Sequence, residues 1–144
     1  MEIIKDLIKL QPEMQNWRRD IHSHPEIAFE EHRTAQIVAE KLESFGIEVE
    51  TGIAGTGVVG TLKKGTGNRS VGLRADLDAL LIHEANDFAH KSQNPGKMHA
   101  CGHDGHTTML LGAAKYLAEK GNFDGTVNFI FQPAEENEGG GKAM

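Results

Sequence analysis

The sequence predicts a mixed α/β fold in which helices cover a sheet, and three observations support this prediction. The chain has 144 residues, 38% hydrophobic and 25% charged, which suits one ordinary globular domain. Apolar residues recur at helical spacing in three segments and at strand spacing in four. These segments follow one another in the order α-α-β-β-β-α-β, which is typical of a mixed sheet flanked by helices.

The first two segments have the spacing of amphipathic helices. The first covers about residues 2–22, where Pro12 predicts a kink or a split into two helices. Its apolar positions are Ile3, Leu7, Leu10, Met14, Trp17 and Ile21. The second covers about residues 30–45 and ends at Gly46. Its inward-facing residues are predicted to be Ala35, Val38, Leu42 and Phe45.

After Gly46 the pattern changes to that of strands. "IEVET" alternates, "GTGVVGTLKK" is rich in β-formers between glycines, and "SVGLRADLDAL" runs into acidic residues. The polar stretch "KKGTGNRS" between the last two predicts a hairpin that joins them. Residues 83–100 are predicted to form a loop.

The final helix and strand bring charged side chains toward each other. The helix is predicted over about residues 105–120, with Asp104 as its N-cap and Gly121 as its C′ residue. The strand "GTVNFIF" ends at Pro133 and delivers a glutamate pair to its tip. The closing "NEGGGKAM" reads as the start of another helix, so we expect a truncated chain.

Composition disfavours several classes of partner. The formal net charge of −6 argues against binding to nucleic acid or to anionic membranes. No apolar run approaches the roughly 20 residues of a membrane span, and the charged N-terminus has no signal-peptide pattern. Because Cys101 is the only cysteine, no internal disulfide can form, and a cytoplasmic location is expected.

The segment "MHACGHDGHTTM", residues 98–109, holds the densest set of reactive side chains. Cys101 and His103 are two positions apart, so in an extended loop both can reach one ion. Thiolate and imidazole suit Zn²⁺ and other borderline metals. Two alternatives remain open from the residues alone. Cys101 could be a buried free cysteine beside solvated histidines, or a nucleophile whose pKa the helix N-terminus lowers.

Two pairs of acidic residues follow predicted strands. Glu135 and Glu136 lie at a strand end, where α/β sheets bind ligands. One could bind a metal while the other acts as general base for metal-bound water. A solvated acidic loop is the alternative. Asp76 and Asp78 could orient a metal-bound histidine, or cap the following turn.

A pair of histidines has the same two-residue spacing as Cys101 and His103. His22 and His24 precede Pro25, so they form either a ligand pair or a turn that ends the first helix.

Taken together, these segments resemble the N-terminal part of the metal-dependent amidohydrolases. This family includes hippurate hydrolase, N-acyl-L-amino-acid amidohydrolase, the auxin-conjugate hydrolases and N-acetyldiaminopimelate deacetylase. It belongs to the wider aminoacylase and carboxypeptidase G clan. The segments that carry the resemblance are "RRDIHSHPEIAFEEHRTA", "GTGVVG", "LRADLDAL", "PGKMHACGHDGHTTMLLGAA" and "GTVNFIFQPAEENEGGGKAM". Of these, "MHACGHDGH" together with "FQPAEE" is the most specific.

The resemblance implies roles for individual residues. It implies that Cys101, His103 and Glu136 bind metal and that Glu135 is the catalytic glutamate that activates water. Asp76 matches the aspartate of the clan's His-x-Asp motif and is predicted as a second catalytic residue.

Four further positions are less sharply predicted. Arg74 stands at the histidine position of the His-x-Asp motif, as is usual in this subgroup. Leu81 stands where the family commonly has proline, which we interpret as a change in turn rigidity. Asp104 is expected to cap its helix or to orient His103, and His106 to contact substrate. His99 has no predicted role.

The resemblance also implies what the chain needs around it. Two divalent metal ions are expected, Zn or Mn, with Co or Ni as further candidates and with further ligands beyond Met144. Residues 1–144 would form the N-terminal part of a catalytic metallohydrolase domain, with the lid or dimerisation domain outside them. The full protein would hydrolyse the amide bond of N-acyl amino acids and could form a homodimer. The alternative is a non-catalytic fragment that binds metal weakly or not at all.

Overall fold

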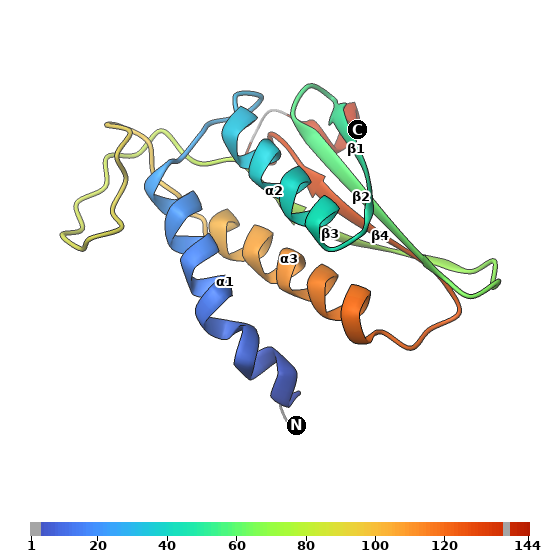
Figure 1. Ribbon diagram of the computed structural model, residues 1–144. Coiled ribbons are helices and arrows are strands. Elements are labelled where there is room, and N and C mark those ends of the chain that lie inside the picture. Colours follow the sequence, from blue (N-terminus) through green and yellow to red (C-terminus); the bar gives the residue numbers. More distant parts are fainter. Residues whose placement is uncertain (1–3, 137–138) are drawn as a thin grey trace.

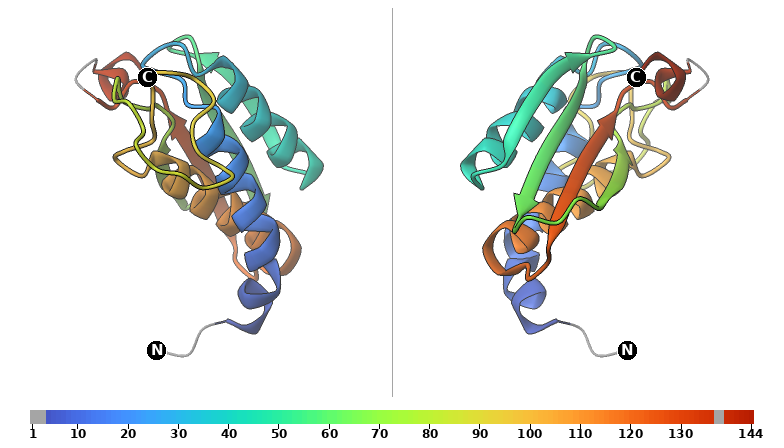
Figure 2. Two further views of the ribbon diagram at one scale, coloured as in Figure 1. Left: turned by 90° about the vertical axis from the view of Figure 1, so that its left-hand side faces the viewer. Right: turned by 90° about the vertical axis from the view of Figure 1, so that its right-hand side faces the viewer.

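The structure, a computed structural model, describes residues 4–136 and 139–144 and has the predicted α/β architecture. Helices α2 and α3 lie on one face of a four-stranded sheet, and α1 packs against α3 (Figure 1). Turning the molecule shows the opposite face of the sheet free of described helices (Figure 2). The elements are α1 (Lys5–Ser23), α2 (His32–Ser44), β1 (Glu48–Ile53), β2 (Gly57–Lys64), β3 (Ser70–Asp76), α3 (His103–Lys120), β4 (Gly125–Gln132) and α4 (Gly140–Ala143).

Helix α1 runs without a break through Pro12, so of the two alternatives, a kink or a split, the split into two helices is wrong. Proline removes the N–H that would donate to the carbonyl of Ile8, and Ile8 is an exposed residue of the helix. The predicted residues 2 and 3 of this helix lie outside the described residues. Trp17 and Ile21 are buried as the spacing predicts. Within the described residues, no helix combines the length and apolarity that a membrane crossing requires.

Helix α2 ends as the sequence predicts. Gly46 has a φ of 75°, its N–H donates to the carbonyl of Glu43, and the Ile47 N–H donates to the carbonyl of Leu42. This pair of hydrogen bonds is the Schellman motif, which satisfies backbone carbonyls at a helix C-terminus. Leu42 and Ile47 are both buried in the core, so the motif also directs the chain into β1.

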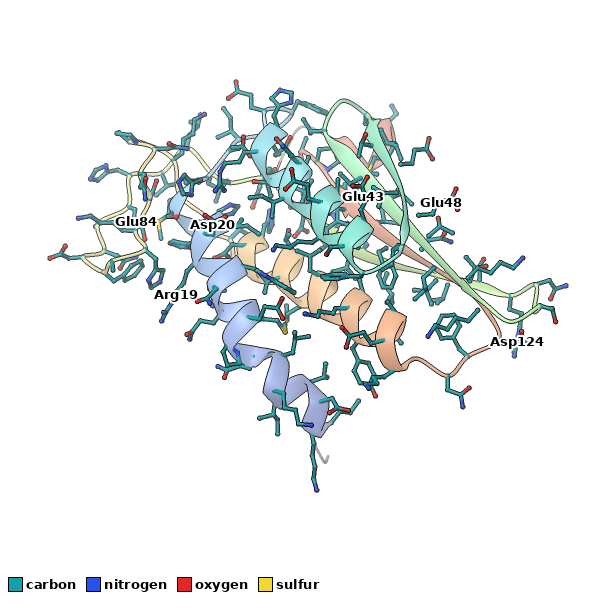
Figure 3. The ribbon with its side chains drawn as sticks, viewed as in Figure 1. Arg19, Asp20, Glu43, Glu48, Glu84 and Asp124 are labelled. Atoms are coloured by element: carbon teal, nitrogen blue, oxygen red, sulfur yellow. The ribbon has the colours of Figure 1, made fainter. Side chains whose placement is uncertain are left out.

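The sheet has the order β1-β2-β4-β3, and this corrects the predicted hairpin between β2 and β3. Strand β4 lies between them, antiparallel to β2 and parallel to β3. Its Phe129 and Phe131 are fully buried, which favours a central place in the sheet. The polar turn instead spans the width of β4. The Asp124 side chain accepts the N–H groups of Thr66 and Gly67 there (Figure 3).

The parallel pairing of β3 and β4 decides where the acidic pairs meet. Asp76 pairs with Gln132 at the carboxyl ends of the two strands. The segments that follow, Leu77–Leu80 and Pro133–Glu136, therefore leave the sheet at one edge. Helix α3 begins at the same edge, and Gly102, with a φ of 98°, is its N-cap.

Candidate metal centre

His103 is the first residue of α3 and is buried, with 2% of its surface exposed. Its Nδ1 lies 2.9 Å from the backbone oxygen of Asp78 and 3.2 Å from the Asp78 Oδ1. Both partners are acceptors, so Nδ1 carries a proton and donates it. The imidazole is thereby held with Nε2 turned away from Asp78, as outer carboxylates hold metal-binding histidines.

Three carboxylates surround the Nε2 of His103. It lies 3.7 Å from Asp76 Oδ1, 3.8 Å from Glu135 Oε2 and 3.7 Å from Glu136 Oε1. Burial lowers the pKa of His103. The hydrogen bond to Asp78 and the charges of Asp76 and Asp78 outweigh burial and raise the pKa to about 8. A buried nitrogen surrounded by carboxylates at these distances has the chemistry of a cation site.

Cys101 completes a ligand set with His103 and Glu136. One thiol, one imidazole and one carboxylate atom of these residues all lie within 4.8 Å of one another. A hydrogen bond to Glu136, burial, and the negative charges of Glu136, Glu135 and Asp76 raise the pKa of the Cys101 thiol to about 11. A nucleophilic cysteine needs a lowered pKa, so this environment disfavours the nucleophile alternative. Cys101 is exposed, so the alternative of a buried free cysteine is wrong.

A second candidate cluster shares His103. Asp76 Oδ1 lies 2.7 Å from His106 Nδ1, and ligand atoms of Asp76, His103 and His106 lie within 4.8 Å of one another. Because Nδ1 of His103 is hydrogen-bonded to Asp78, both clusters need the same Nε2 of His103 as a ligand atom. These residues can therefore hold one ion through His103, in one cluster or the other. Arg74 lies 3.3 Å from the remaining Asp76 oxygen.

Asp78 is the acidic residue that orients the candidate ligands. One of its oxygens contacts His103, and the other accepts the N–H of Glu136 at 2.9 Å. Burial opposes ionisation of Asp78, but the bonds from His103 and from the backbone N–H groups of Glu136 and Glu135 lower its pKa. Asp78 thus forms hydrogen bonds with both His103 and Glu136, whereas Asp76 forms one with His106.

One residue of this region was not among the predicted site residues. Glu31 is fully buried, and its Oε1 accepts the N–H of Ala134, directly before the Glu135–Glu136 pair, at 2.8 Å. An acidic residue in "FEEH" reads as a solvated face, so nothing in the local pattern distinguishes it.

Asp104 is the second residue of α3, so its prediction as N-cap is wrong. It is fully buried, and its Oδ2 lies 3.1 Å from Arg18 Nε and 2.9 Å from His22 Nδ1. These partners come from α1 and compete with the capping role. Its other oxygen accepts the N–H of Gly105. Among the described hydrogen bonds, the Asp104 side chain makes none to the His103 side chain.

The two histidines near Pro25 belong to no metal-ligand cluster among the described residues. His22 lies between Asp104 and Glu84, with Nε2 3.0 Å from Glu84 Oε1. His24 lies 2.8 Å from the backbone oxygen of Asp20, which agrees with a helix-ending turn. His99 is buried, and burial lowers its pKa to about 4.

Glu84 ties the loop beside the C-terminal end of α1 to His22 (Figure 3). Burial raises its pKa, but hydrogen bonds from Asn86, His22 and the Ser92 N–H outweigh burial and lower the pKa from 4.5 to about 2. A lowered folded-state pKa stabilises the fold above pH 4.5, and this contribution is lost as the pH falls toward 2.

We therefore expect Glu84→Gln to lower the free energy of unfolding by about 1–3 kcal/mol at pH 7. The difference from wild type should shrink as the pH falls through 4.5 toward 2. Urea unfolding at a series of pH values measures it. Glu43→Gln, on the exposed face of α2, is the control and should change little. A difference that stays constant down to pH 2 would contradict the role of the ionised carboxylate.

The carboxylates that follow two parallel strands and the thiol and imidazole at the start of α3 form a candidate metal site at one end of an α/β sheet, an arrangement that suits a metal-dependent hydrolase. The model of Peptidase family M20/M25/M40 matches residues 72–144, and the chain belongs to that family of hydrolytic enzymes.

Individual relatives agree with this assignment. A hippurate hydrolase from Campylobacter jejuni is 54% identical over 100% of this chain and 37% of its own length. An N-acyl-L-amino acid amidohydrolase from Geobacillus stearothermophilus is 46% identical over 97% of this chain and 38% of its own length.

A solved structure gives the same result. The Bacillus subtilis YXEP protein, described as a dinuclear metal binding peptidase from the M20 family, superposes with a TM-score of 0.89 at 38% identity. The match covers 94% of this chain and 39% of that one. The chain thus spans less than two fifths of the length of these relatives.

Proposed function

We propose that Cys101, His103 and Glu136 hold a divalent metal ion and that Glu135 is the general base of a hydrolytic site. The observation that carries this proposal is the convergence of three different ligand atoms within 4.8 Å. Thiolate, imidazole and carboxylate together suit Zn²⁺ and Mn²⁺, with Co²⁺ and Ni²⁺ as further candidates. These residues fit a metal ion because the hydrogen bond from His103 Nδ1 to Asp78 leaves Nε2 of His103 available as a ligand atom.

The protein's own groups divide the remaining tasks. A bound divalent ion would polarise the scissile carbonyl and lower the pKa of water toward about 7. Glu135 is 39% exposed and lies 3.8 Å from His103, so its carboxylate can face incoming water. We assign it the transfer of a proton from that water to the leaving amine. Asp76 would support it by holding His106 beside the site.

We further propose that the whole protein hydrolyses the amide bond of N-acyl amino acids. The names of the two curated relatives support this substrate class. Residues 1–144 would be the N-terminal part of the catalytic domain, and a lid or dimerisation domain would lie outside them. A second ion would need further ligands, since each site takes about four and His103 offers one free nitrogen.

The competing proposal is a 144-residue chain that binds one ion but does not catalyse. The single free nitrogen shared by two clusters favours it for this chain alone. Hydrolysis of N-acetyl or N-benzoyl amino acids by the purified chain would refute it.

We expect the purified chain to bind Co²⁺ with a thiolate-to-cobalt charge-transfer band and to lose the band on chelation. Cys101→Ser should abolish the band and weaken binding, because a serine hydroxyl does not ionise near neutral pH. Absorption titration measures both effects. Glu43→Gln should leave both unchanged. Wild-type protein without the band would overturn the assignment of Cys101 as a ligand.

A further inference from the structure

Ala134 has a backbone conformation that alanine rarely adopts. Its φ is 50°, in the left-handed region, and the residue is fully buried. Its N–H donates to Glu31 Oε1, and its carbonyl accepts the N–H of Gly140 at 2.9 Å. Glu135 and Glu136 follow directly. The conformation of this turn therefore sets the path of the chain after β4 and, with it, the directions in which the two glutamate side chains point.

Glu31 lies just before α2, far from Ala134 in the sequence, and no part of it reaches water. Its Oε2 accepts the hydroxyl hydrogen of Thr56 at 2.5 Å, and its Oε1 accepts the Ala134 N–H at 2.8 Å. Both donors are neutral. Burying a carboxylate without a counter-charge is costly. Burial of the Glu31 carboxylate therefore costs folding free energy. The turn that it stabilises is the one directly before Glu135, the candidate base.

We propose that Glu31 is a positioning residue for the Glu135–Glu136 pair. Its carboxylate keeps Ala134 left-handed, while Asp78 Oδ2 accepts the N–H of Glu136 on the other side of the pair. Two carboxylates from different segments thereby fix the turn at both ends and aim the pair at His103. The functional consequence rests on the proposed metal centre, but the geometry can be tested without metal.

Amide hydrogen exchange of the ¹⁵N-labelled 144-residue chain, followed by NMR, tests the geometry. Glu31→Ala should speed exchange at the Ala134 N–H by about tenfold or more, because a bond to a buried carboxylate is lost. Glu31→Gln keeps a weaker acceptor and should give an intermediate rate. The matched control is Glu26→Ala. It removes a carboxylate that accepts the N–H groups of Arg33 and Thr34, and it should leave Ala134 unchanged.

Equal Ala134 exchange in wild type and Glu31→Ala would overturn the proposal. If Glu31→Ala does not fold, Glu31→Gln is compared with Glu26→Gln in the same way. Faster exchange at Ala134 in Glu31→Gln alone supports the proposal, and equal rates overturn it.

Cobalt affinity tests the consequence. Glu31→Ala should weaken Co²⁺ binding about 10–100-fold, as the loss of outer partners of metal ligands commonly does. Adding Ala134→Gly should restore part of that affinity, since glycine adopts a positive φ without a Cβ penalty. Glu26→Ala should stay within about twofold of wild type.

The outcomes separate the two proposals. Wild-type protein that binds no Co²⁺ would defeat the metal centre, while exchange at Ala134 still decides the role of Glu31. Wild-type binding with unchanged affinity in Glu31→Ala would show that Glu31 does not position the pair.

Discussion

Glu135→Gln, made in a protein that extends this chain to the length of its relatives, is expected to lower kcat for an N-acyl amino acid by about 10²–10⁴-fold. Glutamine keeps the shape of the side chain but cannot take a proton from water. Bound metal should be retained, because the proposed ligands are Cys101, His103 and Glu136. Steady-state kinetics and metal analysis of the same samples measure the two effects.

Two further variants make the result specific. Glu136→Gln should lose metal, and with it activity, since it removes a proposed ligand. Glu43→Gln, an exposed change on α2, should alter neither (Figure 3). Retained hydrolysis in Glu135→Gln would end its assignment as base. Loss of metal in that variant would mean that the two glutamates have exchanged roles.

Metal affinity is expected to rise by about 100-fold per pH unit between about pH 6 and 7.5. Burial opposes protonation of His103, but the Asp78 bond and carboxylate charges raise its pKa to about 8. The bond to Glu136, with burial and nearby charge, raises the pKa of Cys101 to about 11. Below pH 8 both groups are therefore protonated, and a metal that binds both must displace two protons. Competition titrations with a chromophoric chelator across this pH range measure the slope.

The matched variant is Cys101→Ser. It keeps His103, so only one proton is displaced and the slope should fall to about tenfold per pH unit. Between pH 8 and 11 the wild-type slope should also approach tenfold, because only the thiol proton remains. A wild-type slope of tenfold below pH 8 would show that Cys101 or His103 is not a ligand.

Most secondary-structure elements could be predicted because local periodicity determines them. The buried stripe of α1, the inward face of α2 with its Gly46 end, and the apolar strand before Pro133 follow from residues close in the chain. The family motif also places the thiol and the imidazole two positions apart, and the glutamates in tandem. These patterns were enough to predict a mixed α/β fold and to name the metal candidates.

Strand partners and the surroundings of the site could not be predicted in this way, because they depend on residues far apart in the sequence. The turn after β2 reads locally as a hairpin, yet β4, with Phe129 and Phe131, takes the central position. Asp104 reads as a cap, but Arg18 and His22 from α1 bind it instead.

The sequence by itself determined which elements form and which side chains are the candidates for the chemistry, since both depend on residues close together in the chain. The tertiary structure alone decided that β3 and β4 end side by side, so that His103 faces Asp76, Glu135 and Glu136. It also decided that Asp78 and Glu31, rather than other acidic residues, fix that arrangement. The physical reason is that a buried carboxylate needs hydrogen-bond donors, and for Asp78 and Glu31 folding brings these donors from distant segments.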